Sequence, residues 1–438
     1  MKLFQQMLVA TAAASLFAPV ATQASDVLNL DGMNDYSRSK KSSKRIDNKT
    51  FINEVNEDLA ILKGRVDGLE AQANNFEAGS FSDTTTLDSK VIFTLGAADF
   101  TGTGADTSDA TKAEGLAATY TYQGNLNTSF TGDDNLYIRL KTGNAAGWMA
   151  EKDEGGYLSS TNTYSDALKV DKIWYTFPVG ESNTFWVGPK IENYYMHATT
   201  PSIYSPTTKQ FALGGNAAAY GASTDSGLGW AYNAENGFAV SSNVVSKQNY
   251  SSSKNPTPDG FLANGSKTSW ATQVGYTQPQ YAVSAILNLK YNGWDDQYFS
   301  TLKGYNRSSN SATGNSTNIG LRGWWRPADT GTATPSISAG YDTSEIDGAT
   351  AGNETTDMWF VGLNWSDMFQ ASDKIGAAFG QPQTNENDTV DPLAWEAYYS
   401  FKGNDSTEHR ATVFGGTDRN GTAGDDIAGL VFETTFKF

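Results

Sequence analysis

The end of the chain alternates apolar and polar side chains. Counting back from Phe438 in steps of two gives Phe436, Thr434, Phe432, Leu430 and Ala428, while Lys437, Thr435, Glu433 and Val431 lie between them. Side chains of a strand alternate between its two faces, so this segment has one apolar and one largely polar face. About 9 to 11 residues let a tilted strand cross a bilayer. The segment fits the last strand of a closed membrane barrel or the edge strand of a soluble sandwich.

The same alternation recurs from Thr84 onward. An early strand places Leu136, Ile138 and Leu140 on one face and Tyr137, Arg139 and Lys141 on the other. Comparable patterns occupy residues 87–95, 270–276, 281–291, 319–325, 359–365 and 393–401. Residues 168–177 and 185–187 alternate less cleanly, and we expect β-bulges or misplaced strand boundaries there. The pattern predicts about 16 strands, within a range of 14 to 18.

The connections between these strands alternate in length. Residues 96–114, 143–167 and 189–224 are long, whereas 131–134, 178–183 and 233–237 are short. Long loops on one side and tight turns on the periplasmic side are typical of transmembrane barrels, whereas a sandwich has no reason to sort its connections in this way. Both ends of the barrel then lie on the periplasmic side, which requires an even number of strands. We therefore predict an all-β fold, a transmembrane antiparallel β-barrel over residues 82–438.

Three segments precede the barrel. Residues 1–24 have a basic start, an apolar run and a small-residue end, as a secretory signal peptide has. Residues 25–50 show no periodicity and contain the basic run Arg38, Lys40, Lys41, Lys44 and Arg45. This run is interpreted as a solvated linker, with contact to an anionic cell-wall polymer as the alternative.

Residues 51–76 carry a heptad pattern. Apolar residues alternate spacings of three and four at Ile52, Val55, Leu59, Leu62, Val66 and Leu69. This is the seam of a coiled coil, and so short a helix is marginal by itself. We predict a periplasmic helix that forms a homotrimer with its copies. A single amphipathic helix lying on the barrel is the alternative.

Composition narrows the function. Mean hydropathy is -0.46, and no run after the first thirty or so residues approaches the ~20 apolar residues of a spanning helix. A net charge of -17 makes nucleic acid an unsuitable partner. The chain has 0 cysteines and 2 histidines, His197 and His409, without catalytic or zinc spacing. We therefore predict no enzyme activity, cofactor or metal site. Acidic pairs such as Asp295–Asp296 fit solvation, with cation binding as the alternative.

A barrel of about 16 strands is wide enough for an aqueous lumen. Strand parity predicts that the pore is lined by Lys90, Tyr137, Arg139, Lys141, Lys290, Arg322, Glu396 and Glu433. The longest loop is predicted to fold inward as a constriction, or alternatively to face the outside, and carries Lys190, Glu192, Tyr194, Tyr195, His197 and Lys209. Phe436 and Phe438 are expected to close the barrel.

Several passages resemble cyanobacterial outer-membrane porins related to carbohydrate-selective (OprB-type) porins. They are residues 34–37 (Asn-Asp-Tyr-Ser), 62–70, 128–132, 140–144, 171–180, 335–341, 362–365, 380–382, 396–399 and 434–438 (Thr-Thr-Phe-Lys-Phe). The resemblance covers nearly the whole mature chain in order. It implies a trimeric general-diffusion porin of the outer membrane. Family members usually carry an S-layer-homology domain before the coiled coil, and here only the run from Arg38 to Arg45 takes that place.

These observations predict a channel in outer-membrane lipid for passive diffusion of inorganic ions and small hydrophilic solutes. A substrate-selective channel for sugars or an iron species is one alternative, and it would need a saturable site in residues 189–224. A structural tether between outer membrane and cell wall is the other, and it would need a plugged lumen.

Overall fold

The computed structural model of the chain describes residues 80–82, 84–102, 115–152, 154–215, 218–220, 224–247, 261–262, 266–292, 294, 315–348 and 354–438. The predicted signal peptide, basic linker and coiled-coil helix lie outside these residues, as do the six apolar residues of the predicted trimer helix. Among the described residues, no helix is long and apolar enough to cross a membrane.

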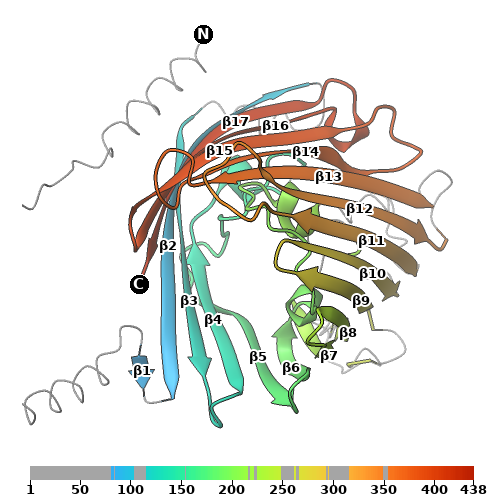
Figure 1. The fold of residues 1–438 in the computed structure, drawn as a ribbon. Helices are drawn as coiled ribbons and strands as arrows, with labels where there is room; N and C mark the ends of the chain where they lie inside the picture. The colour runs from blue at the N-terminus through green and yellow to red at the C-terminus, as the bar shows by residue number, and fades with distance from the viewer. Residues whose placement is uncertain are drawn as a thin grey trace, which may run out of the picture.

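The described chain forms a ring of antiparallel strands (Figure 1). Each strand from β2 onward pairs with its neighbours in sequence, and β17 pairs with β2. A short strand β1 (Ser80–Ser82) adds to β2 outside the ring. The ring contains the strands β2 (Thr85–Thr101), β3 (Ala117–Thr128), β4 (Asn135–Gly143), β5 (Lys169–Val179), β6 (Asn183–Ile191), β7 (Asp225–Asn233), β8 (Phe238–Ser246), β9 (Thr268–Gln278), β10 (Tyr281–Tyr291), β11 (Ser316–Trp325), β12 (Ser336–Ile346), β13 (Thr355–Ser366), β14 (Lys374–Thr384), β15 (Leu393–Asn404), β16 (Thr407–Thr417) and β17 (Asp426–Lys437). The predicted closed barrel of about 16 strands is confirmed.

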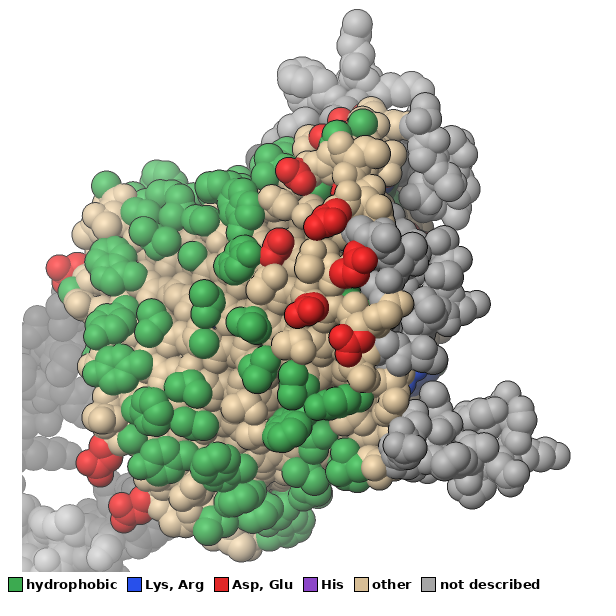
Figure 2. Space-filling model, turned by 90° about the vertical axis from the view of Figure 1, so that its right-hand side faces the viewer, with side chains coloured by type: hydrophobic (Ala, Val, Ile, Leu, Met, Phe, Trp, Pro, Cys, Tyr) green, Lys and Arg blue, Asp and Glu red, His purple; other side chains and the backbone are tan. Residues whose placement is uncertain are grey.

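The two faces of the wall differ in polarity. Along β10, Val283 and Leu287 are exposed, whereas Ser284, Asn288 and Lys290 are buried. β11 and β12 continue the alternation. Figure 2 shows hydrophobic side chains spread over the outer face, with acidic side chains gathered toward the ends of the strands. Because a closed ring leaves no unpaired strand edge, this wall satisfies the backbone within hydrocarbon.

Short turns and long connections alternate from β2 to β11, as predicted. The alternation fails at β12, because the connection before it (residues 326–335) is longer than the one after it (residues 347–354). In the turn before β4, Asp134 accepts hydrogen bonds from the backbone nitrogens of Phe130 and Thr131, at 2.9 and 2.8 Å. The Tyr175 hydroxyl donates to the same carboxylate at 2.6 Å, and these bonds lower the pKa of Asp134. Asp373 binds the turn before β14 in the same way, through the backbone nitrogens of Met368 and Phe369.

Two details of the sheet bear on the predictions. The predicted loop over residues 96–114 begins too early, because β2 continues to Thr101 and pairs with β17 along residues 96–101. The bulges expected near β5 and β6 are confirmed. The register shifts between Arg139 and Leu140 of β4, between Ile173 and Tyr175 of β5, and between Gly188 and Ile191 of β6.

Candidate functional site

The connection after β6 crosses the inside of the barrel. Two of the described connections lie inside the barrel, and we number them in chain order. The described part of this one, residues 192–215 and 218–220, is the second inner segment, and it contains the 3-10 helices η4 (Asn193–Met196) and η5 (Lys209–Gly214). It hydrogen-bonds in turn to buried polar residues of β8, β9, β12 and β16, through the pairs Asn193–Asn243, Thr199–Gln273, Ile203–Ser338 and Thr207–Thr412. Since those residues alternate with the exposed apolar ones, this face is the inner face (Figure 1).

Glycines on the inner face let the second inner segment approach the wall closely. A Cβ atom at Gly275 of β9 would lie 2.1 Å from Oγ1 of Thr199. At Gly340 of β12, a Cβ would lie 2.0 Å from the carbonyl oxygen of Gly214. Real contacts are never this short, so any larger residue would displace the segment.

Glu396 of β15 anchors the middle of the second inner segment. Its Oε1 accepts hydrogen bonds from the Tyr204 hydroxyl at 2.8 Å and the Thr207 nitrogen at 3.1 Å. Its Oε2 accepts two more, both at 2.7 Å, from the nitrogen and hydroxyl of Thr208. The side chain is buried, with 2% exposure. The four donors satisfy both oxygens of this buried side chain, and loss of Glu396 would leave them without an acceptor.

Arg322 of β11 anchors the end of the same segment. Its Nε donates to the Leu213 carbonyl at 3.0 Å, and its Nη1 bonds to Asp342 of β12. The guanidinium lies 4.8 Å from the ring centre of Tyr220, and Asp342 also accepts from the Ala219 nitrogen at 3.1 Å. The ion pair is therefore part of a network that fixes the segment to the wall.

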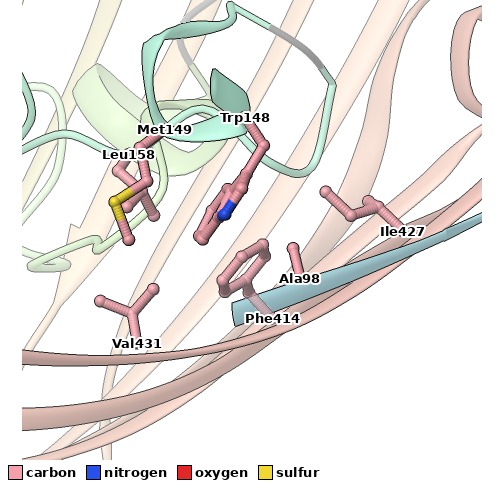
Figure 3. Close-up of a cluster of buried hydrophobic side chains, with 7 residues drawn as sticks. All are labelled: Ala98, Trp148, Met149, Leu158, Phe414, Ile427 and Val431. Carbon is pink, nitrogen blue, oxygen red and sulfur yellow. The ribbon is translucent and has the colours of Figure 1, made fainter. Parts of the chain in front are cut away.

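The connection between β4 and β5 also lies inside the barrel. Its described part, residues 144–152 and 154–168, is here called the first inner segment, and it contains η3 (Gly147–Ala150). Trp148, Met149 and Leu158 pack against Phe414 and Val431 of the inner wall (Figure 3). The Trp148 and Phe414 rings stack with centroids 5.8 Å apart. The sequence analysis identified these residues only as a long connection, although a Trp-Met pair within a polar loop is a signal of packing.

The two inner segments pair with each other. Leu158 forms an antiparallel bridge with Thr208. The Ser159 nitrogen donates to the Thr207 carbonyl at 2.8 Å, and the Lys209 nitrogen donates to the Tyr157 carbonyl at 2.7 Å. Both segments therefore form one joined structure within the barrel.

A cavity of about 210 Å³ lies between this structure and strands β4 and β5. Two ion pairs lie at its wall: Arg139 to Asp171 at 3.2 Å, and Lys172 to Glu192 at 2.7 Å. Burial by itself would raise the pKa of Glu192, but the Lys172 ammonium holds that pKa below its ordinary value. Burial, opposed by Glu192, lowers the pKa of Lys209 to about 8. The cavity lining is thus strongly charged.

An aromatic stack lies beside this cavity. Successive ring centroids are 4.3 Å apart for Tyr137 and Trp174, 4.8 Å for Trp174 and Tyr195, and 4.4 Å for Tyr195 and Tyr194. The Tyr195 hydroxyl bonds to Arg139. The stack connects the wall strands β4 and β5 to the start of the second inner segment.

The predicted pore-lining residues fall into three groups. Tyr137, Arg139 and Lys141 lie near the charged cavity. Lys90 and Glu433 line a second cavity, of about 380 Å³, beside residues 205–207. Lys290, Arg322 and Glu396 are on the inner face but are buried, with 2%, 4% and 2% exposure. Parity alone could not distinguish open from covered positions.

The residues predicted for the constriction loop are mostly in the second inner segment. Glu192, Tyr194, Tyr195, His197 and Lys209 all belong to it. Burial lowers the pKa of His197 to about 3, and its Nδ1 lies 3.4 Å from Ser241 Oγ. Lys190 is a correction, because β6 continues to Ile191 and the Lys190 ammonium donates to the Val170 carbonyl of β5.

The residues predicted to close the barrel lie at the seam between β17 and β2. Phe436 pairs with Val91, and its ring lies 5.5 Å from that of Phe93. Phe438 exchanges two backbone hydrogen bonds with Ser89, at 2.7 and 2.9 Å.

Over the described residues, no group of three or more His, Cys, Asp or Glu side chains is placed to hold a metal ion.

Comparison with known proteins places this geometry in a structural class. No family model matches the sequence. The chain is 25% identical over 432 residues to a Nostoc sp. (strain PCC 7120) protein named "Uncharacterized protein alr4550", covering 88% of this chain and 71% of that protein. Pseudomonas putida OprB has a similar structure, with TM-score 0.53, 10% identity and coverage of 81% of this chain and 94% of OprB. An anion-selective porin from Comamonas acidovorans is also similar, with TM-score 0.52 and 9% identity. The match covers 81% of this chain and 99% of that porin. The chain therefore has the fold of the porins.

Proposed function

We propose that the chain is an outer-membrane porin that passes inorganic ions and small hydrophilic solutes by passive diffusion. The observation that carries the proposal is the second inner segment, fixed by Glu396 and Arg322 across the inside of a barrel whose outer face is apolar. Such a barrel spans lipid, and the segment narrows its interior. Passage then depends on size and on the charges of the lining.

The assembly and location belong to the same proposal. We place the barrel in a Gram-negative type outer membrane, with cyanobacterial origin supported by the sequence resemblance and the Nostoc relative. The protein assembles as a homotrimer through the barrel wall and the heptad helix over residues 51–76, which lies in the periplasm. The basic run from Arg38 to Arg45 contacts an anionic cell-wall polymer.

Swelling of proteoliposomes tests this function. The purified protein is reconstituted, and the vesicles are diluted into iso-osmotic solutions of uncharged sugars of increasing size. A general porin gives rates that fall smoothly with solute size and do not saturate with concentration. Rates indistinguishable from protein-free vesicles for every solute would contradict the proposal and would favour a structural tether.

A sugar-selective channel is the second candidate, favoured by the aromatic stack of Tyr137, Trp174, Tyr195 and Tyr194. Ring faces are surfaces on which the apolar faces of sugars can stack. Trp174 is only 7% exposed, however, so most of its surface is already covered. A swelling rate that saturates for one sugar, and loses saturation in a Tyr194→Ala variant, would identify this second function.

A further inference from the structure

We propose that the cavity between β4, β5 and the two inner segments is a binding site for a small inorganic oxyanion of the phosphate or sulfate type. This inference rests on the proposed function and deepens it, because it gives the channel a preferred class of ion. The cavity is lined by residues of four separate parts of the chain, so it exists only in the folded barrel.

The lining carries a surplus of positive charge. Its cations are Arg139, Lys141, Lys152, Lys172 and Lys209, and its carboxylates are Asp171 and Glu192. Five cations and two carboxylates leave a surplus of three positive charges, in a chain whose net charge is -17. A concentration of one sign of charge in a confined space raises the local concentration of the opposite ion.

Both carboxylates are already engaged. Asp171 accepts from the Tyr164 hydroxyl at 2.8 Å and pairs with Arg139. Glu192 pairs with Lys172 and accepts from Thr224 at 2.6 Å. These contacts leave each carboxylate largely neutralised by its partners. An anion in the cavity therefore meets the remaining cations more than the carboxylates.

Lys141 is the cation best placed for such a ligand. Within the described part of the chain, its side chain makes no hydrogen bond or ion pair, and Lys141 lines the cavity. Lys209 reaches the same cavity from the second inner segment, and burial keeps its pKa near 8, so it carries charge at neutral pH. Two lysines from separate elements suit a divalent anion, because each ammonium is a compact positive charge with three rotatable donors.

Neutral donors and the size of the cavity complete the site. Ser159, Thr161, Asn162 and Thr163 of the first inner segment add hydroxyl and amide groups to the lining. The cavity volume of about 210 Å³ is many times the ~10–15 Å³ that a cavity needs to hold one water molecule. That space accommodates an inorganic oxyanion with part of its hydration shell.

The test is block of chloride current by inorganic phosphate through the purified full chain in planar bilayers. Phosphate is titrated at constant pH and ionic strength, and we expect a saturable reduction of the current. Charge-assisted hydrogen bonds are among the strongest polar contacts, so a Lys141→Gln/Lys209→Gln variant should raise the half-blocking concentration by at least about tenfold. A Lys141→Arg/Lys209→Arg variant should restore block, which separates loss of charge from misfolding.

Lys374→Gln provides the matched control. Lys374 is a cation at the start of β14 that lines two other cavities and not this one. Block that is equally weakened by Lys374→Gln, or a current that phosphate leaves unchanged or reduces without saturation, would overturn the site while open channels still support the proposed function.

Calorimetric titration of phosphate into the detergent-solubilised protein separates the two hypotheses. A protein that forms no channels would contradict the proposed function, yet binding of phosphate does not require conduction. Saturable heat that the Lys141→Gln/Lys209→Gln variant removes would support the site even then. Absent heat, or heat that this variant leaves unchanged, would overturn the site.

Discussion

Glu396 of β15 and Tyr204 of the second inner segment are 192 residues apart in the chain, and their side chains are joined by a hydrogen bond of 2.8 Å. Three further bonds from Thr207 and Thr208 end on the same carboxylate. Strand β15 therefore holds the second inner segment, which follows β6 in the chain, against the inner wall. This contact holds in place a segment that occupies part of the barrel interior.

Replacement of Glu396 by alanine should release the second inner segment. Each buried donor left without an acceptor costs about 1–3 kcal/mol, so the segment should leave the wall for part of the time. We expect larger and noisier single-channel currents in planar bilayers. Glu235→Ala is the control, because Glu235 is exposed in the short turn between β7 and β8, outside both inner segments. Equal currents in wild type and Glu396→Ala would show that the segment does not limit conduction.

Gly340→Ala tests the close approach of the second inner segment to β12. The new Cβ would lie 2.0 Å from the Gly214 carbonyl oxygen, and overpacking of this kind costs about 1–3 kcal/mol. We expect the folded band on an unboiled gel to unfold at a lower temperature. Gly323→Ala on β11 is the matched control, since its Cβ would meet nothing nearer than 3.6 Å. Identical melting of the two variants would show that the close approach at Gly340 does not contribute to stability.

Trp148→Ala tests the anchoring of the first inner segment. Trp148 is 3% exposed and stacks on Phe414, and truncation of a buried tryptophan costs about 3–5 kcal/mol. We expect residues 144–168 to become sensitive to protease added from the long-loop side, while the barrel still assembles. Protease resistance equal to that of wild type would contradict the anchoring role. Phe369→Ala, at a turn position that is 76% exposed, is the control.

The charge of Lys209 predicts a dependence of ion preference on pH. Burial lowers the pKa of Lys209 to about 8, although the nearby Glu192 carboxylate acts to raise it. The ammonium is therefore mostly charged at pH 7 and mostly neutral at pH 9. The ratio of chloride to potassium permeability, taken from reversal potentials in a salt gradient, should fall over this range. The charged groups that face Lys209 are Glu192, Lys172, Arg139, Asp171 and Lys141.

Lys209→Arg is the control for this pH dependence, because arginine stays charged throughout the range. A variant in which the fall between pH 7 and 9 is smaller supports Lys209 as a titrating group of the cavity. Burial raises the pKa of Tyr157 to about 12, so that phenol does not titrate there. The same linkage predicts that stability rises from pH 8 to 10, because an unfolded lysine stays charged up to about 10.4. A pH-independent permeability ratio would contradict the assignment.

Alternation of side chains along the strands carried most of the fold prediction. β10 and β15 are half apolar and half polar, so their period of two is visible without any tertiary information. The end of β2 was missed because Gly96, Ala97 and Ala98 are small and resemble a loop. Their size has a tertiary cause: a Cβ at Gly96 would lie 2.8 Å from the Met149 side chain of the first inner segment.

The candidate site was only partly predictable for the same reason. Parity gave the side of the wall for Arg139 and Lys141, and loop length indicated the second inner segment. Nothing in the local sequence shows that Glu396 meets Thr208, since that contact joins residues 188 positions apart. The first inner segment has no periodicity, and only its packing on Phe414 and Val431 shows its position.

The conductance of the purified full chain in a planar bilayer tests the central claim most directly. The measurement uses a salt gradient, with uncharged sugars titrated on one side. The account predicts stepwise channels that sugar does not block in a saturable way. Saturable block by one sugar would contradict general diffusion, and the absence of any channel from correctly folded protein would contradict the porin function itself.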